Sequence, residues 1–388
     1  MRQRLFEGAA VVRKEGKMAL LTLACPCLFG LESVLSGEIK RLGGHDVEVT
    51  DGRVCFKGDA HMIARANILL RTAERVLIVV GSFRAESFSD LFDGVYSLPL
   101  EDYIGSGDAF PVKGWSLNSK LKSIPDCQSI IKKAAAKRLG NHYGRDWLPE
   151  DGPVHQIQFS ILRDVVTIMI DTSGNGLHKR GYRPTANEAP IKETLAAGIA
   201  DLARVRENTT VIDPFCGSGT LLIESATKAL KIAPGLKRRF AAETWGLIPP
   251  EDWQNERQQS FELVCRDGKF KAIGSDIDSN AIALTNTNSN RAGVAKKISV
   301  SVGDVADLKL PDEPFTLITN PPYGERMLDI RQAEQLYRTM GRVFEPKEGR
   351  SFYIISPHEQ FEKLFGRPAS RRRKLYNGML KCQLYMFF

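Results

Sequence analysis

The residues Asn320, Pro321, Pro322 and Tyr323 form a short motif directly after the apolar run 315–319. A β-rich run followed by two prolines predicts a buried strand that ends abruptly. Because prolines fix φ and lack an N–H group, the backbone after the strand is rigid and its carbonyl oxygens stay free to accept. With the Asn320 amide oxygen and the flat face of Tyr323, this motif suits an amino group on a planar ring. The alternative is a simple strand-terminating turn.

A second set of candidate residues lies between a predicted strand, 210–212, and a predicted helix, 221–230. Strand, glycine turn and helix in this order form the ligand-binding switch point of α/β domains. No Lys-Ser/Thr follows the glycines, and the third glycine of the dinucleotide fingerprint is missing. A ligand with an amino-acid end and a nucleoside end therefore fits better than a phosphate, and its ammonium group can bind Asp213. The candidate cofactor residues of this turn are Asp213, Phe215, Cys216, Gly217, Ser218, Gly219 and Thr220.

Two further predicted strands, 272–276 and 298–303, end in acids. Asp276, followed by Ile277, can accept two ribose hydroxyls, and Asp304, followed by Val305, is placed to bind an adenine amino group. A single acid at a strand end is more often a turn residue. Four polar strand ends in the expected order rarely occur by chance and therefore favour a binding site. The gap between the glycine turn and Asp276 is about twice the usual spacing, and an insertion at 232–268 accounts for it.

These motifs resemble those of class I S-adenosylmethionine-dependent methyltransferases, in which Asn-Pro-Pro-Tyr is typical of enzymes that methylate an amino nitrogen. Residues 176–388, including 178–183 and 189–194, look like the THUMP-containing RNA guanine-N2 methyltransferases. More narrowly, they look like the branch acting on bacterial 23S ribosomal RNA, whose members are often labelled adenine-N6 DNA methylases. The N-terminal half is similar to that family's ferredoxin-like plus THUMP arrangement.

The resemblance implies S-adenosylmethionine as cofactor and RNA as substrate. It implies that the glycine turn lines the methionine and ribose side, with Asp276 at the ribose and Asp304 at the adenine. Residues 190–194 would add a helix beside the methionine end. Asn320 would also border the cofactor. Its amide oxygen and the Pro321 carbonyl would accept hydrogen bonds from the target amine, and Tyr323 would stack on the target base.

Periodicity in the rest of the chain predicts the elements that position these residues. Strand, helix, hairpin and helix follow one another in 18–70, and a second α+β unit follows in 75–171. After a Gly-rich connector, strands and helices alternate, which predicts a parallel, doubly wound Rossmann-like sheet. A tail hairpin at Asn377-Gly378 closes it. The predicted domains are a leader (1–17), a ferredoxin-like domain (18–72), a THUMP domain (73–173) and a methyltransferase domain (174–388).

The net charge of +8 and the pI near 9.0 fit a polyanionic partner. The segment 113–145 carries eight basic residues against one acid, Asp126, which we expect to cap a helix whose outer face is basic. Backbone phosphates are one interpretation of that face, and a solvated helix surface is the other. The candidate RNA-binding residues are Lys120, Lys122, Lys132, Lys133, Lys137, Arg138, Lys179 and Arg180.

Three other functions share parts of this pattern. A DNA adenine-N6 methyltransferase uses the same motif but is disfavoured because the extra N-terminal domain reads as an RNA-binding module. Methylation of a protein glutamine leaves the basic half without a role. A non-catalytic RNA-binding or ribosome-assembly factor would not need a complete cofactor series.

Cysteine usage and the N-terminal apolar stretch decide the expected compartment. Seven scattered cysteines indicate a reducing environment. Cys25-Pro26-Cys27 lacks a second ligand pair, so we expect buried thiols and no metal. The stretch 18–31 resembles a signal sequence, but Pro26 interrupts it, and we expect a buried strand leading into a helix. The prediction is a cytoplasmic protein without a membrane partner.

Overall fold

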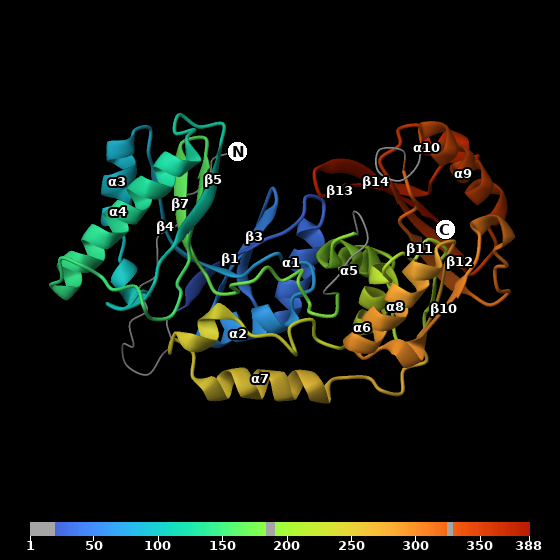
Figure 1. Ribbon diagram of the computed structural model, residues 1–388, viewed down its shortest axis with the longest axis horizontal. Helices are drawn as coiled ribbons and strands as arrows, with labels where there is room; N and C mark the ends of the chain where they lie inside the picture. The colour runs from blue at the N-terminus through green and yellow to red at the C-terminus, as the bar shows by residue number, and fades with distance from the viewer. Residues whose placement is uncertain (1–19, 184–190, 324–328) are drawn as a thin grey trace.

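The computed structural model describes residues 20–183, 191–323 and 329–388, so the predicted leader lies outside the described residues. Two seven-stranded sheets organise the chain, one in each half. Figure 1 shows three regions in a row along the long axis, with 77–171 at one end, 21–69 in the middle and the C-terminal half at the other end. No helix of the described residues is long and apolar enough to cross a bilayer.

The first sheet has the strand order β2-β3-β1-β4-β7-β6-β5. Its strands are β1 (Leu21–Pro26), β2 (His45–Thr50), β3 (Arg53–Gly58), β4 (Leu77–Arg84), β5 (Val112–Leu117), β6 (Ile157–Leu162) and β7 (Val165–Asp171). Its helices are α1 (Glu32–Leu42), α2 (Ala60–Leu69), α3 (Phe88–Tyr96) and α4 (Ile124–Tyr143). The order β1-α1-β2-β3-α2-β4 is the ferredoxin-like arrangement. Because β4 pairs with both β1 and β7, the two N-terminal units share one continuous sheet.

Local sequence explains most of these element ends. Asp59 caps α2 by accepting a hydrogen bond from the Met62 N–H at 2.9 Å. The prediction that Asp126 caps α4 is wrong, because Ser123 is the N-cap residue and its hydroxyl accepts from the Asp126 N–H. Asp126 instead lies in the first turn, where a carboxylate favours the positive end of the helix dipole. The buried face of α4 consists of Cys127, Ile131, Ala134, Ala135 and Leu139.

The second sheet has the order β10-β9-β8-β11-β12-β14-β13. Its strands are β8 (Thr210–Asp213), β9 (Lys271–Asp276), β10 (Ile298–Val302), β11 (Phe315–Thr319), β12 (Arg350–Ser356), β13 (Arg371–Asn377) and β14 (Leu380–Phe387). Its helices are α5 (Glu193–Leu202), α6 (Thr220–Ala229), α7 (Pro250–Glu262), α8 (Ser279–Ala292), α9 (Ile330–Val343) and α10 (Phe361–Phe365). The five strands from β10 to β12 are parallel, which confirms the doubly wound sheet, and β14 is antiparallel to both its neighbours.

The tail hairpin forms where it was predicted, with a shifted turn. Asn377 pairs with Leu380, so the two turn residues are Gly378 and Met379 rather than Asn377 and Gly378. Gly378 has a φ of 66°, which suits the first position of a hairpin turn. The shift leaves Asn377 in the strand, where its side chain is buried.

The insertion 232–268 completes the core of the N-terminal half. In Figure 1, α7 runs below α2, and the segment after it continues beneath the C-terminal region. Trp253 of α7 is buried in one cluster with Ile63 of α2 and stacks on Phe240 at a centroid distance of 5.6 Å. Trp245 stacks on His155 and donates from Nε1 to the Val154 carbonyl at 3.1 Å. The insertion therefore holds all three regions together.

A polar network joins the N-terminal half to α5. Glu74 accepts hydrogen bonds from Lys192 Nζ at 3.0 Å and from the Thr194 hydroxyl, and lies 3.4 Å from His178 Nδ1. Burial alone would raise the pKa of Glu74, but these hydrogen bonds and the charge of Lys192 outweigh it and lower that pKa to about 2. The network fixes the start of α5 against the rest of the molecule.

Candidate functional site

Four predicted site residues meet at one edge of the second sheet. Asp304, Asp276, Asp213 and Asn320 follow or end the strands β10, β9, β8 and β11, which are consecutive neighbours and parallel. Because parallel strands place their carboxyl ends at the same edge, the four side chains lie in a row. Asp213 and Asn320 are therefore on one side of the molecule, as a shared crevice requires.

Asp213 is buried, and its two carboxylate oxygens have different surroundings. Oδ1 accepts from the Thr319 hydroxyl at 2.6 Å and from the Phe215 N–H at 3.1 Å. Oδ2 has no hydrogen-bond partner among the described residues. Burial, with a smaller contribution from the charge of Asp276, raises the pKa of Asp213 to about 7, although both hydrogen bonds act to lower it. A cationic ligand group at Oδ2 would satisfy the oxygen and favour its charge.

The glycine turn is held by its neighbours and leaves one open position. The Gly217 N–H donates to Asp276 Oδ2 at 2.9 Å, and the Gly217 carbonyl accepts from the Thr285 hydroxyl at 2.8 Å. A Cβ on Gly217, where φ is 52°, would meet no described atom within 4 Å. A Cβ on Gly219 would lie 2.7 Å from Thr285. Only the Gly217 side of the turn therefore offers space to a ligand, and Gly219 serves close packing.

The remaining residues of the turn contribute less directly. Cys216, Ser218 and Thr220 are buried, whereas Phe215 is half-buried. Burial raises the pKa of the Cys216 thiol well above its ordinary value, so it stays protonated. The Thr220 hydroxyl accepts from Arg183 Nη1 at 2.7 Å. The structure thus points these three side chains inward, and a ligand would meet the backbone of the turn.

The two acids beyond the turn are also engaged by backbone. Asp276 Oδ1 accepts from the Asp278 N–H at 3.1 Å, and Asp304 Oδ1 accepts from the Ala306 N–H at 2.8 Å. Asp304 is exposed, as is Ile277, whereas Val305 is buried. These hydrogen bonds orient the carboxylates at the sheet edge and leave further acceptor capacity on each.

The Asn-Pro-Pro-Tyr motif follows β11 as predicted. Asn320 Oδ1 is buried and accepts no hydrogen bond from the residues the structure describes. Tyr323 is only 7% exposed, and its hydroxyl accepts from Asn377 Nδ2 at 2.8 Å. The ring therefore lies largely inside the protein, and its stacking on a base stays a prediction.

The predicted RNA-binding residues separate into two groups. Lys122, Lys133, Lys137 and Lys179 are exposed. Lys120 pairs with Glu86, Lys132 with Glu150 and Arg138 with Glu101. The prediction for Arg180 needs correction, because it is 8% exposed and its guanidinium donates to the carbonyls of Leu177 and Arg71. Because its guanidinium is engaged by these carbonyls, Arg180 stabilises the junction between the domains and does not bind an RNA phosphate.

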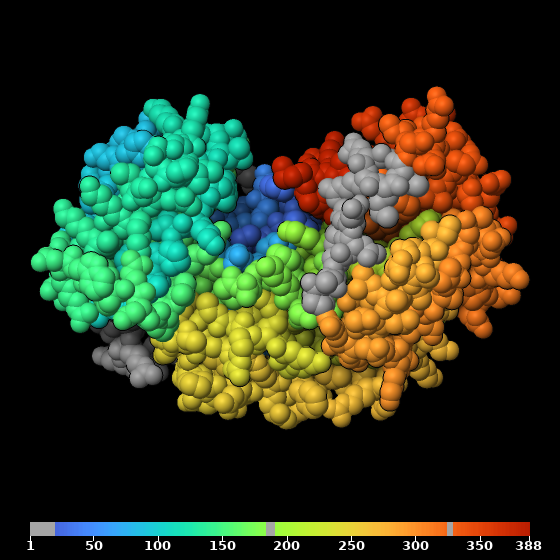
Figure 2. Space-filling model, viewed as in Figure 1, coloured from blue at the N-terminus to red at the C-terminus, as the bar shows by residue number. Residues whose placement is uncertain are grey.

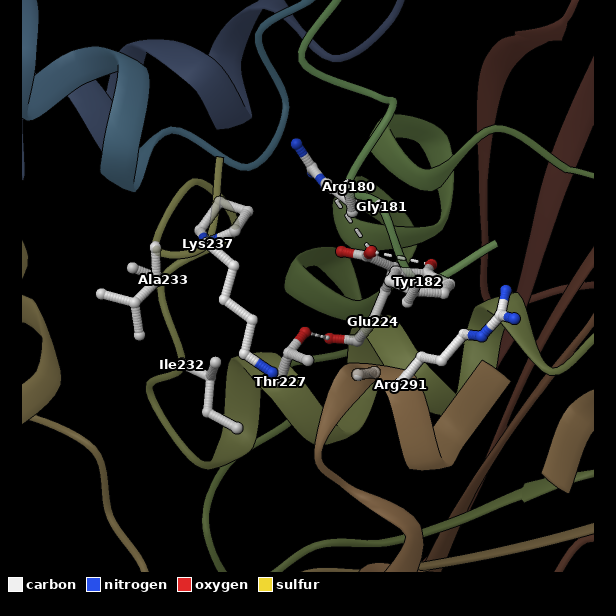
Figure 3. Close-up of a pocket in the computed structure, with 12 residues that line it drawn as sticks. Arg180, Gly181, Tyr182, Glu224, Thr227, Ile232, Ala233, Lys237 and Arg291 are labelled. Atoms are coloured by element: carbon white, nitrogen blue, oxygen red, sulfur yellow. Dashed lines mark hydrogen bonds and ion pairs between the residues drawn. The ribbon is translucent and has the colours of Figure 1, made fainter. Parts of the chain in front are cut away.

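Arg180 lines a cavity of about 200 Å³, together with Tyr182, Glu224 of α6 and Arg291 of α8. Figure 3 shows Arg180 and Tyr182 converging on the Glu224 carboxylate, while Lys237 approaches from the insertion. The Tyr182 hydroxyl lies 3.0 Å from Glu224 Oε1. None of the predicted cofactor residues lines this cavity.

Several residues that shape the site carry no signal in the sequence. Thr319 orders Asp213, Thr285 and Asn288 of α8 hold the glycine turn, and Asn377 holds Tyr323. Thr285 and Asn288 are three positions apart on one helix face, but that spacing is common in any helix. Across 20–183, 191–323 and 329–388 no group of three or more His, Cys, Asp or Glu side chains could hold a metal ion.

Comparison with known families matches all three regions of the chain. A model of the RMKL-like methyltransferase domain matches residues 180–386. A model of the RlmL ferredoxin-like domain matches residues 22–77, and a THUMP domain model matches residues 85–171. The order of the three agrees with the predicted architecture.

Individual relatives cover nearly the whole chain. YpsC of Bacillus subtilis (strain 168), a candidate RNA methyltransferase, is 39% identical over 373 residues, which are 96% of this chain and 97% of YpsC. A candidate methylase from Clostridium difficile 630 superposes with a TM-score of 0.91 at 42% identity, covering 95% of this chain and 98% of that one. The methyltransferase-like SMU.472, solved in complex with SAH, gives a TM-score of 0.90 at 40% identity, covering 96% and 98%.

Proposed function

The chain belongs to the RMKL-like methyltransferase family, and from that premise we propose that it methylates the exocyclic N2 amine of a guanine in RNA. S-adenosylmethionine is its methyl donor, and RNA methyl transfer is the activity that its THUMP domain and its relatives support. The RlmL-like ferredoxin domain favours 23S ribosomal RNA as the substrate. The observation that carries the proposal is the buried Asn320 Oδ1, which has no hydrogen-bond partner among the described residues. It lies next to Thr319, whose hydroxyl donates to Asp213 at the same strand edge.

The residues at this edge fit the proposed donor. Asp213 Oδ2 is a buried acceptor without a described partner, which suits an α-ammonium group. The open position at Gly217 admits a ligand close to the backbone. Asp276, next along the edge, would hold the ribose hydroxyls, and exposed Asp304 would bind the adenine amino group.

The chain itself has a limited chemical task. When bound, S-adenosylmethionine supplies a methyl group that is electrophilic because it is attached to a sulfonium. The protein must position an amine whose lone pair is delocalised into the guanine ring. Asn320 Oδ1 and the Pro321 carbonyl would accept hydrogen bonds from the two N–H groups of this amine. These bonds would favour a tetrahedral nitrogen. No strong general base is required, because the amine proton becomes acidic as the N–C bond forms.

RNA binding rests on the N-terminal half. The exposed residues Lys133 and Lys137 of α4 can each neutralise a phosphate, and so can Lys122 and Lys179. In Figure 1, α4 lies on the side of the first sheet that faces away from the C-terminal half. We infer that the α4 lysines contact RNA some distance from the target base, which suits a large folded substrate.

The test compares wild type with Asn320→Ala. We expect transfer of labelled methyl groups to RNA to fall below detection, because the amine loses its positioning acceptor. Affinity for S-adenosylhomocysteine should stay within about twofold, since Asp213 and the glycine turn are untouched. Asn320→Ala enzyme that still turned over would contradict this mechanism.

The same assay separates the rival functions. Wild type is offered RNA, DNA and protein in parallel, and the methylated product is identified by mass spectrometry. N2-methylguanine in RNA supports the proposal. N6-methyladenine in DNA, methylglutamine in protein, or no transfer at all would each replace it with the corresponding alternative.

A further inference from the structure

Two aromatic rings from opposite ends of the chain meet on the surface near the catalytic motif. Phe29, between β1 and α1, and Tyr376, in β13, have ring centroids 5.8 Å apart at an interplanar angle of 61°. Phe29 is 53% exposed, and Met379, in the adjoining hairpin turn, is 97% exposed. We call Phe29, Tyr376 and Met379 the aromatic platform.

Packing and hydrogen bonds hold the loop that carries Phe29 in place. The ring of Phe29 packs against Gly52, where a Cβ would lie only 3.1 Å from the ring. Glu32 accepts from the N–H groups of Gly30 and Gly52, at 2.9 and 3.1 Å, and so fixes the loop on both sides. Arg373 donates to the Gly30 carbonyl at 2.7 Å, which ties β13 to the same loop. These hydrogen bonds hold the loop that carries the exposed Phe29 ring next to β13.

The platform lies at the catalytic edge of the second sheet. β14 is antiparallel to β12, with Gln383 paired to Ser356 at the carboxyl end of β12. The hairpin turn at 378–379 therefore projects beyond the edge at which Asn320 lies. Asn377, the residue after Tyr376, donates to the Tyr323 hydroxyl at 2.8 Å. A displacement of the hairpin would therefore also displace Tyr323 of the catalytic motif.

The surroundings of the platform are basic. Lys374 Nζ lies 5.3 Å from the centroid of the Tyr376 ring, and the exposed Lys381 is the cross-strand partner of Tyr376. Figure 2 shows the dark red C-terminal hairpin reaching over the blue N-terminal region, beside a hollow that separates it from the green THUMP lobe. Aromatic rings flanked by lysines beside an open hollow are the usual means of binding unpaired nucleotides.

We propose that the aromatic platform stacks bases of a single-stranded RNA segment next to the nucleotide that enters the active site. This inference rests on the proposed function for its choice of ligand. Rings of Phe29 and Tyr376 would contact base faces, Met379 would pack against an adjoining base, and Lys374 and Lys381 would face phosphates. The platform would thereby hold the strand while the target base is turned out of its stack.

The test measures binding of a fluorescent single-stranded RNA dodecamer of mixed sequence by anisotropy. The variant Phe29→Leu with Tyr376→Leu keeps apolar side chains but removes both flat rings, so the fold should persist. We expect its dissociation constant to rise by a factor of roughly five to one hundred. Phe261→Leu is the matched control, because Phe261 of α7 is 48% exposed and its ring lies under the Arg266 guanidinium. In Figure 1, α7 and β13 lie on opposite sides of the molecule. The control variant should leave binding unchanged.

An abasic dodecamer of equal length and charge isolates the stacking contribution. The double variant and wild type should bind it equally, because no base is left to stack. Equal affinity of both proteins for the intact dodecamer would overturn the proposal, and so would wild-type binding that does not distinguish intact from abasic RNA. The melting temperature of the double Leu variant should stay within a few degrees of that of wild type, which shows that the variant is folded. Tyr376→Phe keeps the ring and should retain wild-type affinity.

The two proposals fail in different ways. If wild type forms N2-methylguanine in RNA but the double variant binds normally, only the platform is refuted. If the double variant loses base-dependent binding but no guanine is methylated, the platform stands and the proposed reaction is refuted.

Discussion

Under the proposed role of Asp213, cofactor binding depends on pH in a direction that follows from the burial of its carboxyl group. Its pKa is about 7 because the carboxyl is buried, and Oδ2 has no partner among the described residues. A ligand ammonium binds the ionised carboxylate, so protonation of Asp213 competes with binding. Affinity should therefore rise as the pH is raised from 5.5 to 7.

The size of the effect follows from the fraction ionised. With a pKa of about 7, half of the Asp213 carboxyls are ionised at pH 7 and about 3% at pH 5.5. The dissociation constant of S-adenosylhomocysteine should consequently be roughly fifteenfold higher at pH 5.5, or about 1.6 kcal/mol. The ligand's own α-amino group, with a pKa of about 8, stays largely protonated in this range.

Isothermal titration calorimetry of the full chain with S-adenosylhomocysteine measures this dependence. Asp213→Asn should bind weakly and almost independently of pH, which assigns the titration to this residue. Thr319→Val keeps the shape of residue 319 but removes the 2.6 Å hydrogen bond that lowers the pKa of Asp213. The midpoint should then move to higher pH.

Two results would refute the reasoning. Wild-type affinity that is constant between pH 5.5 and 7 would show that Asp213 does not titrate in contact with the ligand. A midpoint that moves to lower pH in Thr319→Val would show that the hydrogen bond does not favour the charged carboxylate.

Three further predictions concern stability and RNA binding. The pKa of Glu74 is lowered to about 2, so its carboxylate contributes roughly 3 kcal/mol of stability. This stability is present above about pH 4.5 and is lost as the pH falls toward 2. In urea unfolding, the free energy of unfolding of Glu74→Gln should therefore depend less on pH in this range. Trp253→Ala should lower the free energy of unfolding by about 3–5 kcal/mol, because it opens a cavity between α7 and α2, and near wild-type stability would refute the role of the insertion. The double variant Lys133→Gln with Lys137→Gln should make the slope of log K against log salt concentration less steep by roughly 0.7–0.9 for each phosphate no longer neutralised. Arg138→Gln should mainly affect stability, since Arg138 is already paired with Glu101. An unchanged salt slope in the double lysine variant would reduce the α4 face to a solvated surface.

Sequence reasoning located the strand ends accurately because their signals are local. The double proline after β11, the glycines before α6, Asp276 at the end of β9 and Asp304 after β10 all reflect preferences of a few adjacent residues. Parallel neighbours then bring the carboxyl ends together as a rule of topology. The main error in element ends, Asp126 instead of Ser123 as a cap, is a shift of three residues within one helix start.

The role of individual basic residues was much harder to predict. Arg180 and Lys179 are adjacent in the sequence, but one is buried under carbonyl oxygens and the other is exposed. Similarly, Arg138 and Lys137 differ because only Arg138 faces Glu101. Whether a charge meets RNA or an acid depends on partners that are distant in the sequence.

The sequence alone determined the motif series, the doubly wound sheet and the identity of the four strand-end residues, because short-range backbone preferences and hydrophobic periodicity are written in neighbouring positions. Only the tertiary structure decided that Asn377 holds Tyr323, that the insertion completes the N-terminal core, and that Asp213 lies in surroundings that raise its pKa to about 7. Those properties arise from burial and from contacts between segments far apart in the chain, which no local pattern encodes.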